Sequence, residues 1–145
     1  MPQLEDLSTP TASLQLVFVY GTLRRGEQRD INCLFPAPIW VGRGCVTGTL
    51  YDLGDYPGLV LDACGATGGE VMGEVYRVTA ELAHLLDEIE EVWPQNSGEY
   101  TRKHVTVAMD KSLPGGKQQL VCLMYEVNPL RTHGKTVIAS GNWVR

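Results

Sequence analysis

Apolar runs with the composition of β-strands recur along most of the chain. The first, LQLVFVY at residues 14–20, is typical of a strand that is buried on both faces. Pro57 and Gly58 predict a turn inside the third run, and the last two runs are predicted to pair as a hairpin across residues 110–117, where Pro and Gly are frequent. The later runs occupy residues 45–53, 56–62, 69–78, 101–109 and 118–127.

One segment, residues 79–91, has a clear helical period. Thr79 is a suitable N-cap residue, because its hydroxyl can accept a hydrogen bond from a free N–H group of the first turn. A shorter second helix is predicted at about residues 28–35. The apolar stripe of the main helix is formed by Leu82, Leu85, Leu86 and Ile89, at positions i, i+3, i+4 and i+7.

Strands outnumber helices, and the main helix lies between strands in the sequence. This order predicts an α+β fold with a mixed, strongly curved sheet that approaches a small barrel. The 145 residues suffice for a single domain, which we expect at residues 14–145. Residues 1–13 are polar and acidic, so we expect a loose N-terminal tail there rather than a signal peptide.

Charge and cysteine content narrow the classes of function. With 12 basic and 17 acidic residues the net charge is −5, which argues against general binding to nucleic acids or anionic membranes. No apolar run approaches the ~20 residues that span a bilayer. The 4 cysteines lack C-x-x-C spacing and the 3 histidines are dispersed, so the usual zinc signatures are absent. We therefore expect a cytoplasmic protein with reduced thiols and no metal or cofactor, although a Cys–His pair that meets only in space stays open.

Glu90 is the acidic residue of the helix that lies closest to the apolar stripe. At about 100° per residue, it falls roughly a quarter-turn from the centre of the stripe, whereas Asp87 and Glu91 are predicted to point to water. Partial burial, the neighbouring acids and the negative end of the helix dipole should raise the pKa of Glu90 toward the range useful for proton transfer. The alternative is an ordinary solvated helix end.

The turn that follows Tyr20 is a candidate anion site. The backbone N–H groups of Gly21, Thr22 and Leu23 can point into a common concavity and hold a carboxylate or a phosphate. The sequence has neither the P-loop spacing nor the dinucleotide-binding glycine pattern here. A plain turn with exposed Arg24 and Arg25, or a phosphate site that uses these arginines, are the alternatives.

Together these segments resemble the γ-glutamylcyclotransferase-like superfamily, in particular its small members allied to γ-glutamylamine cyclotransferase and the plant AIG2-type proteins. The Y-G-T-L-x-x-G motif, the L-D-x-x-E helix and Y-x-R occur in the family's order from about Leu16 to Trp143. The segments that carry the resemblance are residues 17–26, 50–60, 73–78, 85–91, 100–102 and 123–128.

The resemblance implies a role for each matching residue. The turn formed by Tyr20, Gly21, Thr22 and Leu23 would hold the glutamyl group of the substrate, and Glu90 would be the catalytic acid–base. Tyr100 and Tyr125 would line the pocket or donate hydrogen bonds there, and Arg102 would orient the site. Core aromatics with satisfied hydroxyls are an equal alternative for the two tyrosines.

The activity implied is cyclisation of the γ-glutamyl group of a γ-glutamyl amine or amino acid to 5-oxoproline, with release of the free amine and without metal or cofactor. The alternative is a non-catalytic pocket protein of the same fold that binds a small carboxylate or a protein partner. Two departures from the family leave the substrate open: a long segment at residues 91–99 that contains Trp93, and Glu91 where many members have a small residue.

Overall fold

A computed structural model describes residues 15–61, 69–90, 98–110 and 118–143. The predicted tail at residues 1–13, the connection at 111–117 and residues 91–97, which include Glu91 and Trp93, lie outside the described residues. None of the helices in the described ranges has the length and apolar character needed to cross a membrane.

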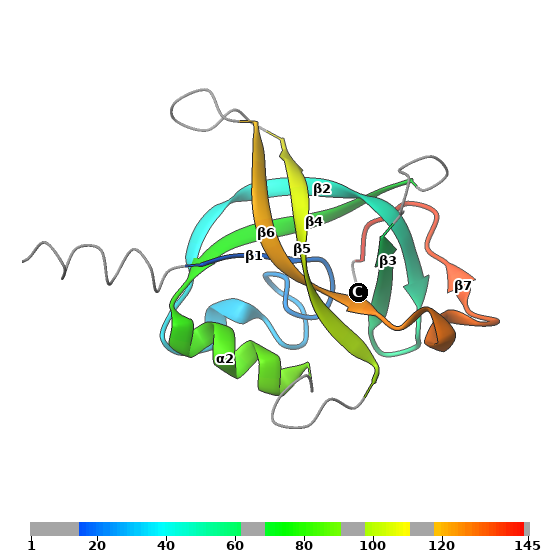
Figure 1. Cartoon of the computed structure of the whole chain (residues 1–145), viewed down its shortest axis with the longest axis horizontal. Coiled ribbons are helices and arrows are strands. Elements are labelled where there is room, and N and C mark those ends of the chain that lie inside the picture. The colour runs from blue at the N-terminus through cyan, green and yellow to red at the C-terminus, as the bar shows by residue number, and fades with distance from the viewer. Residues whose placement is uncertain (1–14, 62–68, 91–97, 111–117, 144–145) are drawn as a thin grey trace, which may run out of the picture.

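In the described ranges, seven strands form one mixed sheet, as the strand-rich sequence predicts. The order is β3-β2-β4-β1-β6-β5, and a further pairing between β2 and β5 closes five of these strands into a small barrel (Figure 1). β1 lies between β4, which is antiparallel to it, and β6, which is parallel. The strands are β1 (Gln15–Val19), β2 (Ile39–Asp52), β3 (Pro57–Leu61), β4 (Gly69–Val78), β5 (Tyr100–Met109), β6 (Gln119–Val127) and β7 (Thr136–Val137).

β1 is buried on both faces, which confirms the interpretation of its apolar run. Val17 and Val19 join a cluster that packs against the helix, whereas Phe18 and Tyr20 join a second cluster with interior residues of the other strands. Side chains alternate across a strand, so a central strand with core on both sides needs apolar residues at every position.

The helix α2 (Ala80–Ile89) begins and ends close to the predicted bounds. The Thr79 side chain accepts a hydrogen bond from the Leu82 N–H group (3.1 Å), and Glu90 is the C-cap. Figure 1 shows α2 below the strands. Its buried residues Leu82 and Leu86 pack in the same cluster as Ile31, so the helix is held against both the sheet and the loop after β1.

The second predicted helix, at residues 28–35, is a single 3-10 turn, Ile31–Cys33. The Asp30 carboxylate caps this turn by accepting a hydrogen bond from the Asn32 N–H group (2.8 Å), and the chain turns extended at Leu34, which ends it. A second 3-10 turn, Pro129–Thr132, follows β6.

Two further predictions concern the strands. The hairpin is confirmed, since β5 and β6 pair antiparallel from Tyr100–Val127 to Ala108–Gln119. The turn predicted at Pro57 and Gly58 is wrong, because both residues lie in β3 and the chain reverses before them, where the Leu53 N–H group donates to the Tyr56 carbonyl (3.0 Å). Gly58 serves close packing instead, because a Cβ atom there would lie 2.8 Å from Val127.

Candidate active site

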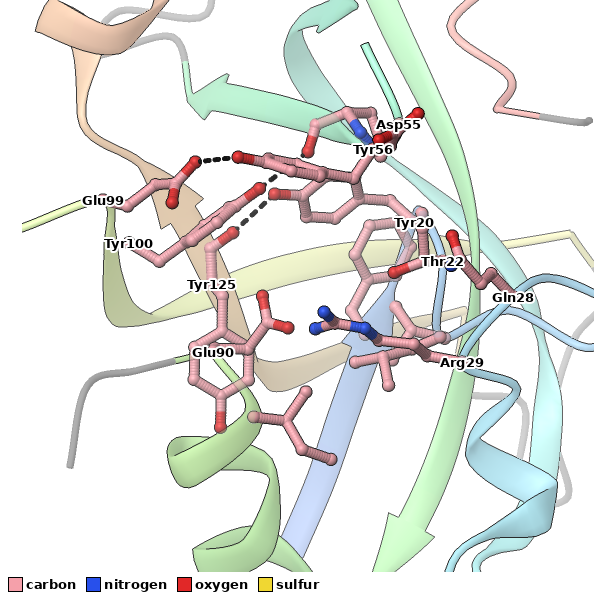
Figure 2. A pocket seen from close by; sticks show the side chains of 16 residues that line it. Tyr20, Thr22, Gln28, Arg29, Asp55, Tyr56, Glu90, Glu99, Tyr100 and Tyr125 are labelled. Carbon is pink, nitrogen blue, oxygen red and sulfur yellow. Dashed lines mark hydrogen bonds between the residues drawn. The ribbon is translucent and has the colours of Figure 1, made fainter. Parts of the chain in front are cut away.

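A cavity of about 270 Å³ opens where the turn after β1 meets the C-terminal end of α2 and the start of β5. The loop before β3 and Arg29, from the loop after β1, complete its wall (Figure 2). The cavity thus collects segments that are far apart in the sequence, and it contains most of the residues singled out above.

The turn of residues 20–23 uses its carbonyl groups for its own structure. Gly21 O accepts from Arg24 N (3.0 Å), Thr22 O from Arg29 N (2.8 Å) and Leu23 O from Ile31 N (2.8 Å). Within the described part of the chain, the N–H groups of Gly21, Thr22 and Leu23 donate to no protein acceptor. Because all three residues line the cavity, their N–H groups are the candidate donors for an anionic ligand.

Glu74 of β4 supports this turn from behind. Its side chain is buried, and its carboxylate accepts hydrogen bonds from the Arg25 N–H group and the Tyr76 hydroxyl, both at 2.9 Å. The Arg24 Nε atom lies 3.5 Å from the same carboxylate, and the Arg25 guanidinium lies 4.4 Å from the centre of the Trp40 ring. Both arginines therefore act on the protein itself, which disfavours the phosphate-site interpretation.

Glu74 was not among the residues predicted from the sequence. The alternation along β4 places Glu74 on the same face as Tyr76. The sequence alone indicates that this face is exposed, because its burial depends on contact with the loop after β1. Burial raises the pKa of Tyr76 to about 12, and the hydrogen bond to the Glu74 carboxylate adds to this increase.

Glu90 lines the cavity as the C-cap residue of α2, and its carboxylate points into the cavity in Figure 2. The buried arc of α2 includes Ala83 and Asp87 as well as the leucines, so it is centred closer to the direction of Glu90 than the apolar stripe alone suggests. The helix geometry therefore brings this carboxylate to the junction between helix and sheet.

The prediction that Asp87 points to water is wrong. It is 8% exposed, and its carboxylate accepts hydrogen bonds from the Tyr125 hydroxyl (2.6 Å) and from Arg102 Nη1 (2.8 Å). The apolar stripe alone does not define the buried face of the helix, because a carboxylate with two strong donors can be buried beside apolar residues. Arg102 does not line the cavity and reaches it only through Asp87 and Tyr125.

Tyr20, Tyr100 and Tyr125 all line the cavity, but each hydroxyl donates its proton to another protein group. Tyr20 donates to the carbonyl of Tyr125 (2.7 Å), Tyr100 to the carbonyl of Pro57 (2.9 Å) and Tyr125 to Asp87. The alternative of core aromatics with satisfied hydroxyls therefore describes their hydrogen bonding, and Tyr100 in this arrangement offers no proton to a substrate.

Electrostatics link the same tyrosines to Glu90. Burial raises the pKa of Tyr20, Tyr100 and Tyr125 well above the usual value, and the negative charge of Glu90 adds to the increase at each one. Glu90 is thus the acidic group whose field reaches all three aromatic walls of the cavity.

Several cavity residues were not singled out from the sequence. Tyr56 donates a hydrogen bond to the Glu99 carboxylate (2.6 Å), and both residues line the cavity opposite the turn. In Figure 2 the guanidinium of Arg29 and the carboxylate of Glu90 point toward one another across the cavity. Tyr56, Glu99 and Arg29 lie before β3, before β5 and after β1, so only the folded chain brings these side chains to the site.

Comparison with known proteins gives consistent matches. The family model described as "Gamma-glutamyl cyclotransferase, AIG2-like" matches residues 17–145. A Halalkalibacterium halodurans protein that is provisionally named a gamma-glutamylcyclotransferase is 32% identical over 100 residues, which cover 68% of this chain and 80% of that protein. The gamma-L-glutamyl-butirosin B gamma-glutamyl cyclotransferase of Niallia circulans is 38% identical over 76 residues, 52% of this chain and 45% of its own length. The crystal structure of an AIG2-like protein from Mus musculus superposes with a TM-score of 0.69 at 25% identity, covering 87% of this chain and 86% of the mouse chain.

Proposed function

Because the chain belongs to the gamma-glutamyl cyclotransferase, AIG2-like family, we propose that it cyclises the γ-glutamyl group of a small substrate to 5-oxoproline and releases the free amine. In this proposal the turn of residues 20–23 binds the glutamyl α-carboxylate, and Glu90 moves the protons. The substrate is a γ-glutamyl amine or amino acid, and the reaction needs no group beyond the side chains and amides of the cavity.

One observation supports the proposal most directly. The available N–H groups of Gly21, Thr22 and Leu23 and the carboxylate of Glu90 line the same cavity, although the turn and the helix end lie far apart in the sequence. A cavity of about 270 Å³ has room for a glutamyl group, whose α-carboxylate and α-amine are carried by the same carbon and in this proposal face the turn and Glu90. Anchoring one end of such a short chain favours ring closure, because the two reacting groups are then held close together.

The chemical steps follow from this placement. Glu90 takes one proton from the α-ammonium group, and the free amine attacks the γ-carbonyl carbon. The tetrahedral oxyanion that forms needs a hydrogen-bond donor, which we assign to an N–H group of the turn, since the tyrosine hydroxyl protons are donated to protein acceptors. As the bond between the γ-carbon and the leaving nitrogen breaks, Glu90 passes a proton to that nitrogen.

The number of protons that the α-nitrogen loses equals the number that the departing amine gains. Two protons leave the α-nitrogen, one before the attack and one from the new ring nitrogen, and two arrive at the departing amine. Glu90 relays both and ends the cycle ionised, as it began.

Substitution Glu90→Gln tests this role, because it preserves the shape of the side chain and removes the base. We expect a loss of about 10²–10⁴ in kcat, measured as 5-oxoproline formed from an accepted γ-glutamyl compound. Glu88→Gln, at an exposed position of the same helix, is the matched control and should change kcat little. Activity of Glu90→Gln within about tenfold of the wild type would exclude Glu90 as the acid–base.

The alternative of a non-catalytic pocket protein makes a different prediction for the same assay. A panel of γ-glutamyl amines, γ-glutamyl amino acids and glutathione would then yield no 5-oxoproline, while 5-oxoproline or glutamate would still bind the wild-type protein in calorimetry.

A further inference from the structure

A second hollow, of about 490 Å³, adjoins the cavity. It is lined by residues 27–30, by Cys33 and Leu34, and by Ile89 of α2, and it shares Gln28, Arg29 and Ile89 with the cavity. The N–H groups of the turn line only the first cavity. A molecule anchored on the turn therefore enters the second hollow by passing between Arg29 and Ile89.

The side of the cavity from which the leaving group departs follows from the position of Glu90. In the proposed reaction, Glu90 gives a proton to the leaving nitrogen, so this nitrogen must lie beside the C-terminal end of α2. Ile89 is the residue directly before Glu90, and it is the part of α2 that both hollows share. The leaving group then extends from Glu90 along Ile89 into the second hollow.

Arg29 gives this passage a positive charge. Arg24, Arg102 and Lys103 form ion pairs with carboxylates, whereas Arg29 takes part in no ion pair among the described residues. Its backbone is fixed, since its N–H group donates to the carbonyl of Thr22, and its guanidinium points across the cavity in Figure 2. Arg29 can therefore offer a fork of N–H donors to a carboxylate of a bound molecule.

The other walls of the hollow define the rest of the group. Leu34 and Ile89 are partly buried apolar side chains, which suit an aliphatic chain. The Asp30 carboxylate accepts hydrogen bonds from the N–H groups of Gly26 and Asn32 (both 2.8 Å), so its charge is used to shape the loop. Glu27 is the remaining acid that lines the hollow.

We propose that the second hollow is the leaving-group subsite and that it takes an amino acid with an aliphatic side chain, whose carboxylate binds Arg29. The inference rests on the proposed function, and it selects γ-glutamyl amino acids over γ-glutamyl amines that lack a carboxylate. Arg29 is then a residue that determines specificity and has no part in the proton transfers.

Two compounds that differ only in the carboxylate test this selection: γ-glutamyl-leucine and γ-glutamyl-3-methylbutylamine. For the wild type we expect kcat/KM to be about tenfold or more higher for γ-glutamyl-leucine, because one charge-assisted contact is gained. In Arg29→Gln the preference should disappear, because kcat/KM for γ-glutamyl-leucine falls about tenfold more than kcat/KM for the amine compound. Arg131→Gln, at an exposed arginine outside both hollows, should keep the preference, and Glu27→Gln should increase it by removing a repulsive charge.

Equal kcat/KM for the two compounds in the wild type, or an equal loss on both in Arg29→Gln, would overturn the inference, since Arg29 would then act on the glutamyl group or not at all. A binding assay separates this from failure of the proposed function. With 5-oxoproline present, leucine should bind the wild type at least about tenfold more tightly than Arg29→Gln. Leucine binding that is insensitive to Arg29 refutes the subsite, whereas absence of 5-oxoproline from both compounds refutes the reaction.

Discussion

The hydrogen bond between Tyr125 and Asp87 is the contact whose removal gives the sharpest test of the site's architecture. Both residues are buried, and the hydroxyl and carboxylate oxygens are 2.6 Å apart. A hydrogen bond to a charged group contributes about 1.5–3 kcal/mol to stability. The second partner of Asp87 is Arg102, whose side chain is 45% exposed, and an ion pair with that much solvent contributes only about 0.2–1 kcal/mol.

Tyr125→Phe removes this hydrogen bond and keeps the aromatic ring against the cavity. We expect the free energy of unfolding to fall by about 2 kcal/mol, because the buried carboxylate keeps only its half-exposed partner Arg102. Arg102→Gln should cost less, about 1 kcal/mol or below. Urea unfolding at neutral pH, with fluorescence and circular dichroism as independent probes, measures both differences.

A double-mutant cycle isolates the pair. Asp87→Ala and Tyr125→Phe each remove the same bond, so the double variant should be more stable than the sum of the two losses implies, with a coupling energy of about 1 kcal/mol or more. The activity of Tyr125→Phe should fall less than that of Glu90→Gln, because Asp87 only fixes the helix turn that carries Glu90. Additive losses, within about 0.5 kcal/mol, would refute the idea that this bond anchors the end of α2.

Three further outcomes follow from other contacts. Gly73→Ala should destabilise the protein by about 3 kcal/mol or prevent folding, since its Cβ atom would lie 2.5 Å from a backbone oxygen and from a ring carbon of β1. The control in urea unfolding is Gly69→Ala, whose Cβ atom meets no atom within 4 Å. Glu74→Ala should raise KM for a γ-glutamyl substrate by loosening the turn, and exposed Glu70→Ala on the same strand should leave KM unchanged. Burial raises the pKa of tyrosines such as Tyr20 in the folded protein only, so the stability that these groups contribute should be fully present below pH 10 and be lost as the pH rises above it. Each such group lowers the free energy of unfolding by about 1.4 kcal/mol per pH unit above pH 10. Tyr20→Phe should therefore flatten the plot of the urea-derived free energy of unfolding against pH.

The sequence allowed the main elements to be predicted where local patterns and tertiary structure agree. The leucine stripe and the Thr79 cap of α2, and the apolar run of β1, each depend on neighbours in the sequence, so their periods survive in the fold. The Pro57–Gly58 turn failed for the opposite reason. A glycine that turns a chain and a glycine that admits Val127 at close range look the same in a sequence.

The residues of the candidate site also divide into those that a local pattern predicts and those whose place depends on tertiary structure. The direction of Glu90 could be worked out from helix geometry, and the turn after Tyr20 from its composition. The burial of Asp87 could not, because its partners Tyr125 and Arg102 lie on strands whose register only the closed barrel fixes. Arg29 likewise gains its place from the loop after β1, where the sequence predicted a helix at about residues 28–35 and the chain forms a single 3-10 turn.

The parallel pairing of β1 with β6 has a consequence for how the molecule acquires its site. Val17 lies opposite Leu123, so β1 finds this neighbour only after the intervening strands β2 to β5 have been made. Contacts of such long range close slowly, because a large loop must be ordered before they form. The turn after β1 precedes β6 in the chain, and β6 carries Tyr125, which lines the cavity. The turn therefore cannot form a complete site until β6 is in place, and variants that lack β6 should bind no ligand.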